Sequence, residues 1–409
     1  MDYWLAGIAV RSLSKPRPPE IPAGLFSEDA RALAEDPTID VVIECIGGTG
    51  IAAELVVGAL SAGKHVVTAN KDLLATRGPE LRALAASRGV TIAYEAAVGG
   101  AIPIVRTIAE SLAGEDILEV GGVLNGTTNF ILSEMFEGAT YASALAQAQR
   151  LGFAETDPTN DVEGIDAGHK LAILAQLAFR RGLVTSEIPR HGITTLVRED
   201  HSLAKRAGWR LKLIAVARAA SSIVTPAYVS AEHPFAQPVG PQNCIRVTGR
   251  SSGSLTFAGT GAGSDPTASS VVGDVVAVLR RIAAGRNAGV ATADTQLAPV
   301  RTGVVEPAIM LRRVLRLASL GDVRPAREAL VAGGIAAEPL GALPAVITTR
   351  IDKAGATLVD ELLASRNVTI GNVIPLWEDL AVTPALPHVL DGLAVDIAHE
   401  SGSAISTPA

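Results

Sequence analysis

The first third of the chain alternates short apolar runs with longer amphipathic segments. The apolar runs are rich in β-branched residues and cover residues 5–10, 41–46, 65–69, 91–94 and 117–124. Helical spacing fills three of the intervals, and each helical segment ends at or near a glycine: residues 51–62, 72–88 and 102–112. Strands that alternate with helices are typical of parallel βαβ units. The pattern predicts an α/β fold with a doubly wound parallel sheet, in which ligands bind beyond the carboxyl ends of the strands.

The pattern changes after residue 124. Helical spacing is strong at residues 141–151 and 164–181, and strand-like runs follow at residues 212–216, 225–229 and 243–247. Residues 125–285 are therefore predicted to form an α+β domain that holds the substrate. Residues 286–303 are rich in small residues and are predicted to be a linker.

The pattern beyond the linker predicts a small βαββαβ module. Residues 304–378 carry a strand, then a helix, a strand, a helix and a strand, the last four at residues 323–332, 345–350, 355–365 and 368–374. Residues 379–409 end in small and polar side chains, and we expect a frayed tail. Residues 1–124, before the substrate domain, make up the predicted nucleotide-binding domain.

Composition narrows the class of protein. The chain has 409 residues, of which 48% are hydrophobic and 19% charged, enough for two or three globular domains. A net charge of −7 argues against nucleic acid as a partner. The most apolar stretch is interrupted by carboxylates, so no membrane span or secretory signal is predicted. Cys45 and Cys244 lie far apart, and we expect two reduced core thiols in a cytoplasmic protein whose partners are small molecules.

Residues 152–170 carry the densest chemistry. Five carboxylates precede Lys170 there: Glu155, Asp157, Asp161, Glu163 and Asp166. Asp166 and Lys170 are four residues apart at the beginning of a predicted helix, so both side chains project from one face. The alternative is a capped helix with an ordinary surface ion pair, which would add little. The excess of acidic groups before the helix disfavours that alternative.

Two polar motifs follow predicted strands. Asn70 and Lys71 come at the end of the run 65–69, where a lysine could fix a carboxylate or polarise a carbonyl; a lysine that leaves for solvent is the alternative. The second motif, Asn125-Gly-Thr-Thr-Asn129, follows the run 117–124 and precedes an apolar segment. A helix cap is the alternative for this motif.

Two glycine-rich segments could approach a ligand closely. Residues 95–103 follow a strand, and backbone carbonyls there could hold a hard cation together with Glu95. Residues 259–268 precede an apolar helix, and their amides could contact a ligand. A plain strand-to-helix turn and a flexible loop are the respective alternatives.

One expected feature of a dinucleotide site is missing. Such a site begins with a strand and a Gly-x-Gly-x-x-Gly turn, whereas the run 5–10 is typical of the second strand of the unit. Arg11 follows that run in place of an acidic residue, with Lys15 and Arg17 nearby. These cations favour a ribose 2′-phosphate, so NADP is expected over NAD if a dinucleotide binds.

Together these motifs resemble the homoserine dehydrogenases, in the bacterial form with an appended regulatory module. The resemblance covers residues 5–285, and the run that ends at Lys170 is its most specific part. It implies a truncated Rossmann-like sheet, a substrate and dimerisation domain, and NAD(P)-dependent interconversion of L-homoserine and L-aspartate 4-semialdehyde on the route to threonine, methionine and isoleucine. Because the glycine turn is missing, we expect weakened cofactor affinity. The alternative is a non-catalytic amino-acid-binding regulatory protein derived from that enzyme.

The resemblance also implies residue roles. Lys170 would be the acid/base at the substrate oxygen, Lys71 the second active-site lysine, and Asp166 their catalytic partner near the substrate hydroxyl. Glu155 would take the substrate ammonium, and the implied substrate contacts further include Asp161, Asp166, Asn125 and Thr127. The implied cofactor contacts are Arg11, Ile46, Gly47, Gly48, Lys71 and Gly263. A sodium ion would be held at Glu95, Val98, Gly100 and Ile102.

The module at residues 304–378 is similar to an ACT domain, which binds an amino acid for feedback control in related enzymes. The resemblance therefore implies L-threonine as an effector. A dimerisation module is the alternative for this segment. The family further implies a homodimer or higher homo-oligomer, with no nucleic-acid or membrane partner.

Overall fold

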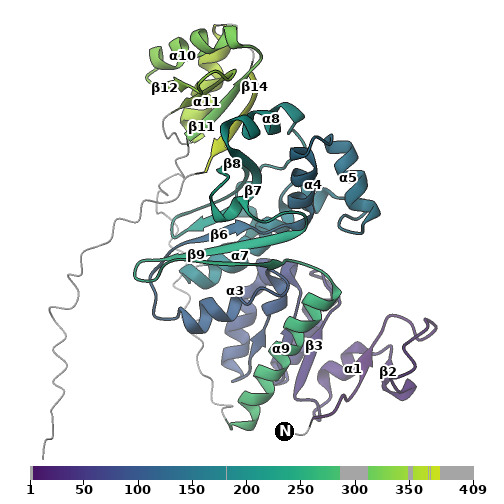
Figure 1. Ribbon diagram of the computed structural model, residues 1–409. Coiled ribbons are helices and arrows are strands. Elements are labelled where there is room, and N and C mark those ends of the chain that lie inside the picture. The colour runs from purple at the N-terminus through teal and green to yellow at the C-terminus, as the bar shows by residue number, and fades with distance from the viewer. Residues whose placement is uncertain are drawn as a thin grey trace, which may run out of the picture. The chain divides into compact units, whose positions relative to one another are not determined.

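The computed structural model describes residues 3–180, 182–285, 312–348, 353–366, 368 and 370–377. The predicted linker at 286–303 and the predicted tail at 379–409 lie outside the described residues. Figure 1 shows the order of the elements along the chain. Within the described ranges, no helix is both long enough and apolar enough to cross a bilayer.

The N-terminal part contains a parallel sheet, as predicted, but only three of the five predicted strands belong to it. Its strands pair in the order β3-β4-β5, with bounds Val41–Glu44, His65–Thr68 and Ile92–Ala93. The connections are α2 (Ile51–Ser61) and α3 (Lys71–Ser87), which begin and end within one residue of the predicted helices. Asn70 caps α3 because its side-chain oxygen accepts a hydrogen bond from the Leu73 amide at 3.1 Å. This cap places Lys71 at the carboxyl edge of the sheet.

One prediction for this part is wrong, and another is confirmed only in part. The run 5–10 contributes only β1 (Ile8–Ala9), which pairs with β2 (Phe26–Ser27) in a separate two-stranded sheet beside α1 (Ala30–Glu35). The hydrophobic pattern identifies a strand but not its partner. The helix expected at 102–112 begins late: residues 105–111 are helical, and Thr107–Ser111 form a π-helical turn. Pro103 explains the late start, since the residue before a proline avoids helical angles.

The second sheet has nine strands in the order β10-β9-β6-β7-β8-β14-β11-β13-β12. Its first five strands in chain order are β6 (Ile117–Val123), β7 (Trp209–Arg218), β8 (Ser221–Ser230), β9 (Gln242–Gly249) and β10 (Gly253–Thr260). The prediction that 117–124 joins the parallel sheet is wrong, because β6 lies antiparallel between β7 and β9. Gly121 and Gly122 permit this close pairing: a Cβ would lie 2.2 Å from the Ala215 oxygen at the first and 2.0 Å from the Cys244 oxygen at the second.

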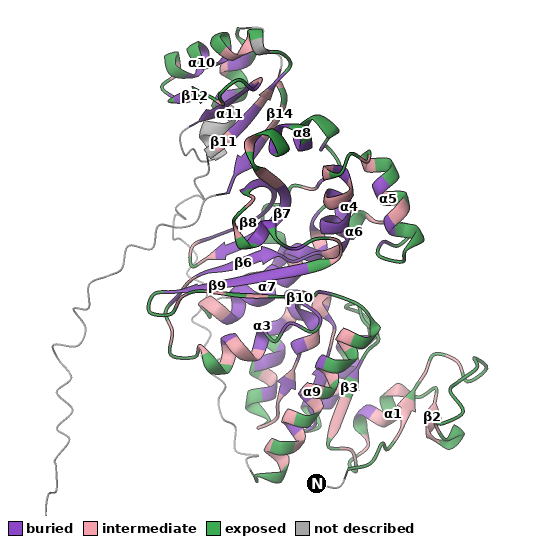
Figure 2. Cartoon of the chain, viewed as in Figure 1, coloured by how far each residue is buried: buried purple, intermediate pink, exposed green. Residues whose placement is uncertain are grey.

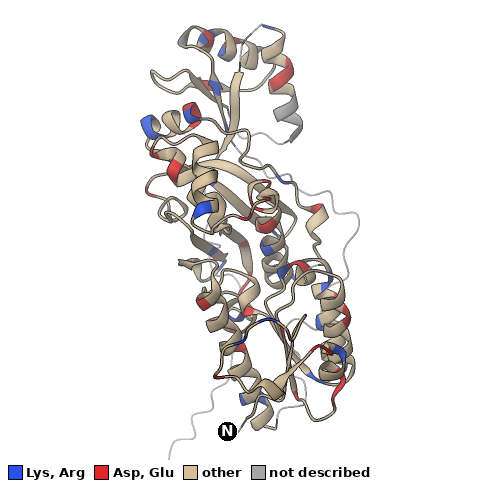
Figure 3. Cartoon of the chain, turned by 90° about the vertical axis from the view of Figure 1, so that its right-hand side faces the viewer, with Lys and Arg blue, Asp and Glu red and all other residues tan. Residues whose placement is uncertain are grey.

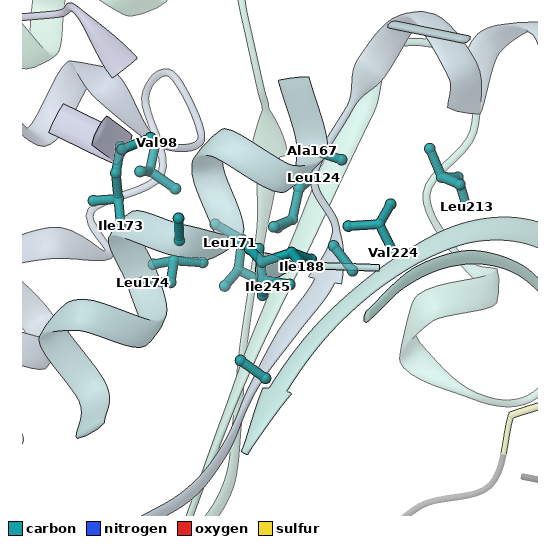
Figure 4. Close-up of a cluster of buried hydrophobic side chains, with 14 of the residues drawn as sticks. Val98, Leu124, Ala167, Leu171, Ile173, Leu174, Ile188, Leu213, Val224 and Ile245 are labelled. Atoms are coloured by element: carbon teal, nitrogen blue, oxygen red, sulfur yellow. The ribbon is translucent and has the colours of Figure 1, made fainter. Parts of the chain in front are cut away.

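Helices cover this sheet and carry most of the candidate chemistry. They are α4 (Gly126–Phe136), α5 (Tyr141–Arg150), α6 (Thr159–Val162), α7 (Ile165–Phe179) and α8 (Arg198–Ala207). The last long helix, α9 (Ser264–Ala283), packs instead against β4 and β5 of the parallel sheet. Nearly the whole of α7 is buried (Figure 2), and it packs against β6, β7 and α3. Figure 4 shows Leu171 and Leu174 of α7 in one apolar cluster with Leu124 and Ile245. This packing holds the helix that carries Lys170.

The C-terminal part has the predicted βαββαβ order. Its elements are β11 (Arg312–Leu317), α10 (Val323–Ala332), β12 (Ala337–Pro339), β13 (Ala345–Thr348), α11 (Lys353–Ala364) and β14 (Ile370–Leu376). The strands are antiparallel in the order β14-β11-β13-β12. The end of β14 pairs with β8, with Leu376 opposite Tyr228.

The structure also shows where the charged residues and the two cysteines lie. Figure 3 shows basic and acidic residues interspersed along the described elements. Cys244 is a buried free thiol, as predicted. The same prediction for Cys45 is wrong: this thiol is exposed because it follows β3, where the chain leaves the sheet.

Candidate functional site

Lys170 and Asp166 form a buried pair in the first two turns of α7. The Lys170 Nζ lies 2.8 Å from the Asp166 Oδ2, and each side chain is only 9% exposed. The same Nζ donates a hydrogen bond to the Leu124 carbonyl at 2.9 Å. Leu124 follows β6, so the ammonium is held between a helix and the end of a strand. The surface ion pair that the spacing also allowed is excluded by this burial.

A second lysine from another part of the chain reaches the same carboxylate. The Lys71 Nζ lies 3.3 Å from the Asp166 Oδ1. Burial alone would raise the pKa of Asp166, but Lys170 and Lys71 outweigh burial and lower that pKa to about 2. Burial in turn would lower the pKa of Lys71, but Asp166 and Asp72 raise it overall. Asp166 is therefore ionised and Lys71 protonated at neutral pH.

Asn125 joins this cluster to a further carboxylate. Its Nδ2 donates to Asp161 Oδ1 at 2.7 Å and to Asp166 Oδ2 at 2.8 Å. Its Oδ1 accepts a hydrogen bond from the Thr128 amide at 2.8 Å, which caps α4. The cap offered as an alternative by the sequence is thus present, and the same side chain also belongs to the cluster. Burial raises the pKa of Asp161, against the lowering effect of its hydrogen bond with Asn125.

The loop that follows β3 is tied to the beginning of α3. Asn70, the residue directly before Lys71, donates a hydrogen bond from its Nδ2 to the Gly48 carbonyl at 2.7 Å. Glu44 braces the same loop, because one of its carboxylate oxygens accepts the amides of Ile46 and Gly47 at 2.6 and 2.8 Å. Gly47 and Gly48 have φ of +80° and +73°, and a Cβ at either would meet open space. The turn presents bare backbone at the carboxyl edge of the parallel sheet.

The two glycine-rich segments predicted from the sequence lie against each other. A Cβ on Gly100 would fall 2.8 Å from the carbonyl carbon of Gly261, so the two backbones meet there without side chains between them. Ser270 Oγ of α9 donates to the Gly100 carbonyl at 2.7 Å. Gly263 caps α9 with a φ of +126° that favours glycine.

Glu95 is buried beneath these segments. Its carboxylate accepts hydrogen bonds from the amides of Val105 at 2.7 Å and Arg106 at 3.0 Å, and from Arg106 Nε at 3.1 Å. Asp274 Oδ2 accepts the Glu95 amide at 2.7 Å, and burial raises the pKa of Asp274 to about 6. Because both Glu95 oxygens face N–H donors and a guanidinium, its side chain does not fit a sodium ion. Among the described residues, no group of three or more His, Cys, Asp and Glu side chains is placed to hold a metal.

Other candidates do not join the cluster. Glu155 is exposed, and its carboxylate forms no hydrogen bond or ion pair with the part of the chain that the structure describes. Asp157 caps its own turn by accepting from Thr159 N at 3.1 Å and Oγ1 at 2.6 Å. Arg11 is exposed. Thr127, in contrast, does lie at the cluster, because its hydroxyl group is close enough to Asp161 to lower the pKa of that carboxyl group. Its Oγ1 donates to the Phe153 carbonyl at 2.6 Å, which ties α4 to the acidic run.

Two features were missed in the sequence. Asn243 of β9 is fully buried, and its Nδ2 donates to the Leu124 carbonyl at 3.0 Å, the same oxygen that Lys170 contacts. A single asparagine in a strand carries no signal for this role. His169 Nδ1 lies 2.7 Å from Asp72 Oδ1. Here a signal was present, since each residue is the chain neighbour of one of the two lysines.

Two family models with related descriptions match most of the chain. The family model described as homoserine dehydrogenase, NAD binding domain, matches residues 1–95, and the model described as homoserine dehydrogenase matches residues 103–276. The homoserine dehydrogenase of Bacillus subtilis is 44% identical over 283 residues, which cover 68% of this chain and 65% of that protein. The Mycobacterium tuberculosis protein of the same name is 41% identical over 312 residues, with 74% and 70% covered. The chain thus spans slightly less than two thirds of some relatives.

Solved structures agree in fold. A homoserine dehydrogenase from Thiobacillus denitrificans superposes with a TM-score of 0.82 at 36% identity, and the match covers 91% of this chain and 90% of that one. A hyperthermophilic archaeal homoserine dehydrogenase in complex with NADPH superposes with a TM-score of 0.56 at 30% identity, over 62% of this chain and 75% of the other.

Proposed function

The chain belongs to the homoserine dehydrogenase family, and from that premise we propose that it interconverts L-homoserine and L-aspartate 4-semialdehyde with NAD(P). The observation that carries the proposal is the convergence of Lys71 and Lys170 on the single buried carboxylate of Asp166. The three residues come from the two segments that the two family models match.

The residues around the glycine turn fit a nicotinamide dinucleotide. Gly47 and Gly48 leave open space above their backbone, and Ile46 beside them is 53% exposed. A flat ring could lie against such a surface. When bound, the dinucleotide accepts a hydride from the alcohol or delivers one to the aldehyde. Preference for NADP is supported by the exposed Arg11. Comparison of the KM values for NADP⁺ and NAD⁺ tests this preference.

Lys170 is proposed to move the proton at the substrate oxygen. In the oxidation of homoserine, the Lys170 ammonium first releases a proton to solvent. Its neutral amine then takes the hydroxyl proton as a hydride leaves the terminal carbon of the substrate. In the reverse direction, the ammonium returns this proton to the oxygen of the aldehyde as hydride arrives. The Leu124 carbonyl and Asp166 hold the Nζ in place, which general acid–base catalysis requires.

Asp166, Lys71 and Asn125 are proposed to provide a fixed electrostatic frame. Because Asp166 contacts both lysines and the Asn125 amide, its carboxylate group stays in place when charge develops on the substrate oxygen. Lys71, 38% exposed, has further donors that can face substrate or cofactor.

Asp161 and Glu155 are proposed to take the substrate ammonium, with Thr127 beside them. The raised pKa of Asp161 supports this, because a cation next to its carboxylate would offset the cost of burial. The exposure of Glu155 also supports this role, since its carboxylate is available to a ligand.

Sodium takes no part in the proposed steps. The carbonyls of Val98, Gly100 and Ile102 remain candidate ligands of a sodium ion, but the charge of the Glu95 carboxylate is already compensated by Arg106.

The homodimer also stays a proposal from the family. A cytoplasmic location is proposed because both cysteines are free thiols.

We propose further that the βαββαβ module is an ACT-like domain that senses L-threonine. Its antiparallel four-strand order and its contact with α8 support a regulatory role. Addition of L-threonine to the activity assay is the test. Inhibition at millimolar concentrations is expected, and an unchanged rate would favour the dimerisation module instead.

The proposed activity is tested by homoserine-dependent reduction of NADP⁺, compared with NAD⁺, with Lys170→Ala as the blank. We expect turnover by the wild-type chain and its loss in the variant. A folded wild-type protein that binds homoserine but reduces neither dinucleotide would instead support the non-catalytic amino-acid-binding protein.

A further inference from the structure

A hydrogen-bonded pair links the two helices that carry the lysines. Asp72 is the second residue of α3 and His169 the fifth residue of α7, and the two helices pack together. The His169 Nδ1 lies 2.7 Å from the Asp72 Oδ1. This bond to His169 lowers the pKa of Asp72, so an ionised acceptor faces the imidazole at neutral pH.

The position of the pair relative to the lysines is specific. Asp72 directly follows Lys71, and His169 directly precedes Lys170. The Lys71 and Lys170 ammoniums lie 3.3 and 2.8 Å from the two oxygens of Asp166. The first turns of α3 and α7 are therefore joined twice, once through Asp166 and once through the Asp72–His169 pair.

The same helices are also joined further along. Arg82 Nη2 of α3 donates to Gln176 Oε1 of α7 at 3.1 Å, and Gln176 Nε2 donates to the Ala75 carbonyl at 3.4 Å. Gln176 is completely buried and Arg82 is 5% exposed. That contact fixes the inner part of the helix pair, whereas the Asp72 and His169 side chains, 41% and 19% exposed, lie at the end that carries the lysines.

We propose that Asp72 and His169 are a positioning pair that sets how Lys71 and Lys170 are held around Asp166, and thereby the rate of the chemical step. The inference rests on the proposed function. Neither side chain is assigned contact with substrate. A displacement of about 1 Å in a reacting group can cost up to about 100-fold in rate. Loss of the pair should thus lower kcat and leave substrate binding nearly unchanged.

The test uses the full chain, four variants of the pair and one control variant. His169→Ala removes the hydrogen bond, and His169→Asn keeps an N–H donor near the position of Nδ1. Asp72→Ala and the double variant His169→Ala/Asp72→Ala complete a cycle. Glu80→Ala is the matched control, because it removes an exposed ion pair with Arg77 on the same helix α3. Thermal unfolding of each variant checks that it is folded.

We expect His169→Ala to lower kcat about 10-fold, with the KM for homoserine and NADP⁺ within about twofold. His169→Asn should recover most of kcat, the double variant should resemble the single ones, and Glu80→Ala should match the wild type. Unchanged kcat in both alanine variants, a loss confined to KM, or no recovery in His169→Asn would overturn the positioning role alone. A wild-type chain without turnover would contradict the proposed function and the inference with it.

Discussion

The Lys170 ammonium lies 2.8 Å from the Asp166 carboxylate, one helical turn earlier in α7, with both side chains 9% exposed. An i,i+4 ion pair on a helix surface contributes only a few tenths of a kcal/mol. Burial changes this, because removal of one partner leaves the other charge uncompensated. Lys71 contacts the same Asp166 carboxylate, so a change at Asp166 affects two lysines at once.

Asp166→Asn should therefore reduce both activity and stability. The amide keeps an acceptor for Lys170 but removes the charge that holds two ammoniums together. We expect kcat to fall by about 100-fold or more, and the free energy of unfolding to fall by about 3 kcal/mol. Steady-state kinetics and urea denaturation measure the two effects. Asp157→Asn, at an exposed carboxylate that bonds only within its own turn, is the control. Equal kcat in both variants would exclude a role for the Asp166 charge.

Asn125→Ala should separate capping from substrate binding. The variant loses the cap of α4, worth about 1 kcal/mol, and removes the amide that joins Asp161 to Asp166. We expect the KM for homoserine to rise about 10-fold, since a lost hydrogen bond to charged groups costs roughly 1.5–3 kcal/mol. Thr140→Ala removes the cap of α5 in the same way, by deleting the acceptor of the Ser143 amide. Its loss of stability should be similar while its KM stays unchanged. A KM that rises equally in both would mean that the cap alone matters.

Asp274→Asn should change how stability depends on pH. The pKa of Asp274 is raised from 3.8 to about 6, chiefly by burial, so the folded state binds this proton more tightly than the unfolded chain. Its favourable contribution is complete below pH 4 and is lost as the pH rises through 6. A shift of about two pKa units corresponds to about 3 kcal/mol. The variant, which stays uncharged, should match the wild type at pH 4 and exceed it in unfolding free energy at pH 7.5.

Denaturation at several pH values, with the exposed Asp265→Asn on the same helix as control, tests this prediction. A constant difference between variant and wild type across this pH range would show that Asp274 does not titrate there.

Arg316→Met should loosen the C-terminal module. Arg316 Nε of β11 lies 2.6 Å from Asp200 Oδ1 of α8, and the Asp200 side chain is completely buried. The other Asp200 oxygen accepts from Asn372 of β14 at 3.0 Å. Loss of the guanidinium leaves this buried carboxylate without its cation, at a cost of about 3–5 kcal/mol.

Arg324→Met is the matched control for this prediction, because its ion pair with Glu328 is exposed. That change should alter stability by less than about 0.5 kcal/mol. Chemical denaturation of the full chain distinguishes the two variants, and equal stability would show that the Arg316–Asp200 pair contributes nothing.

Local elements were largely predictable from the sequence. Hydrophobic periodicity and glycine stops predict α10 with the same bounds as the structure and α2, α3 and α5 to within one residue. Strand partners were not predictable, because the period of a strand carries no information about its neighbour; β1 and β6 were therefore assigned to the wrong sheet. Strand β10 was missed because its small and polar residues lack an apolar run.

In the candidate site, too, contacts within one helix were predictable, whereas contacts between separate elements were not. Lys170 and Asp166 were predictable because they share one helix face, where spacing fixes their distance. Their contacts with Lys71, Asn125 and Asn243 depend on how separate strands and helices pack, which spacing does not encode. The contacts of the Glu95 carboxylate could not be predicted for a related reason, since Arg106 and two amides meet it only in the folded chain.

The most direct test of the central claim follows the transferred hydrogen. L-Homoserine deuterated at both hydrogens of its terminal carbon is incubated with NADP⁺ and the full chain, and the reduced dinucleotide is analysed by mass spectrometry. We predict a reduced dinucleotide one mass unit heavier than unlabelled NADPH, with a rate that Lys170→Ala abolishes. Reduced dinucleotide without deuterium, or no reduction by a folded chain with either NADP⁺ or NAD⁺, would contradict it.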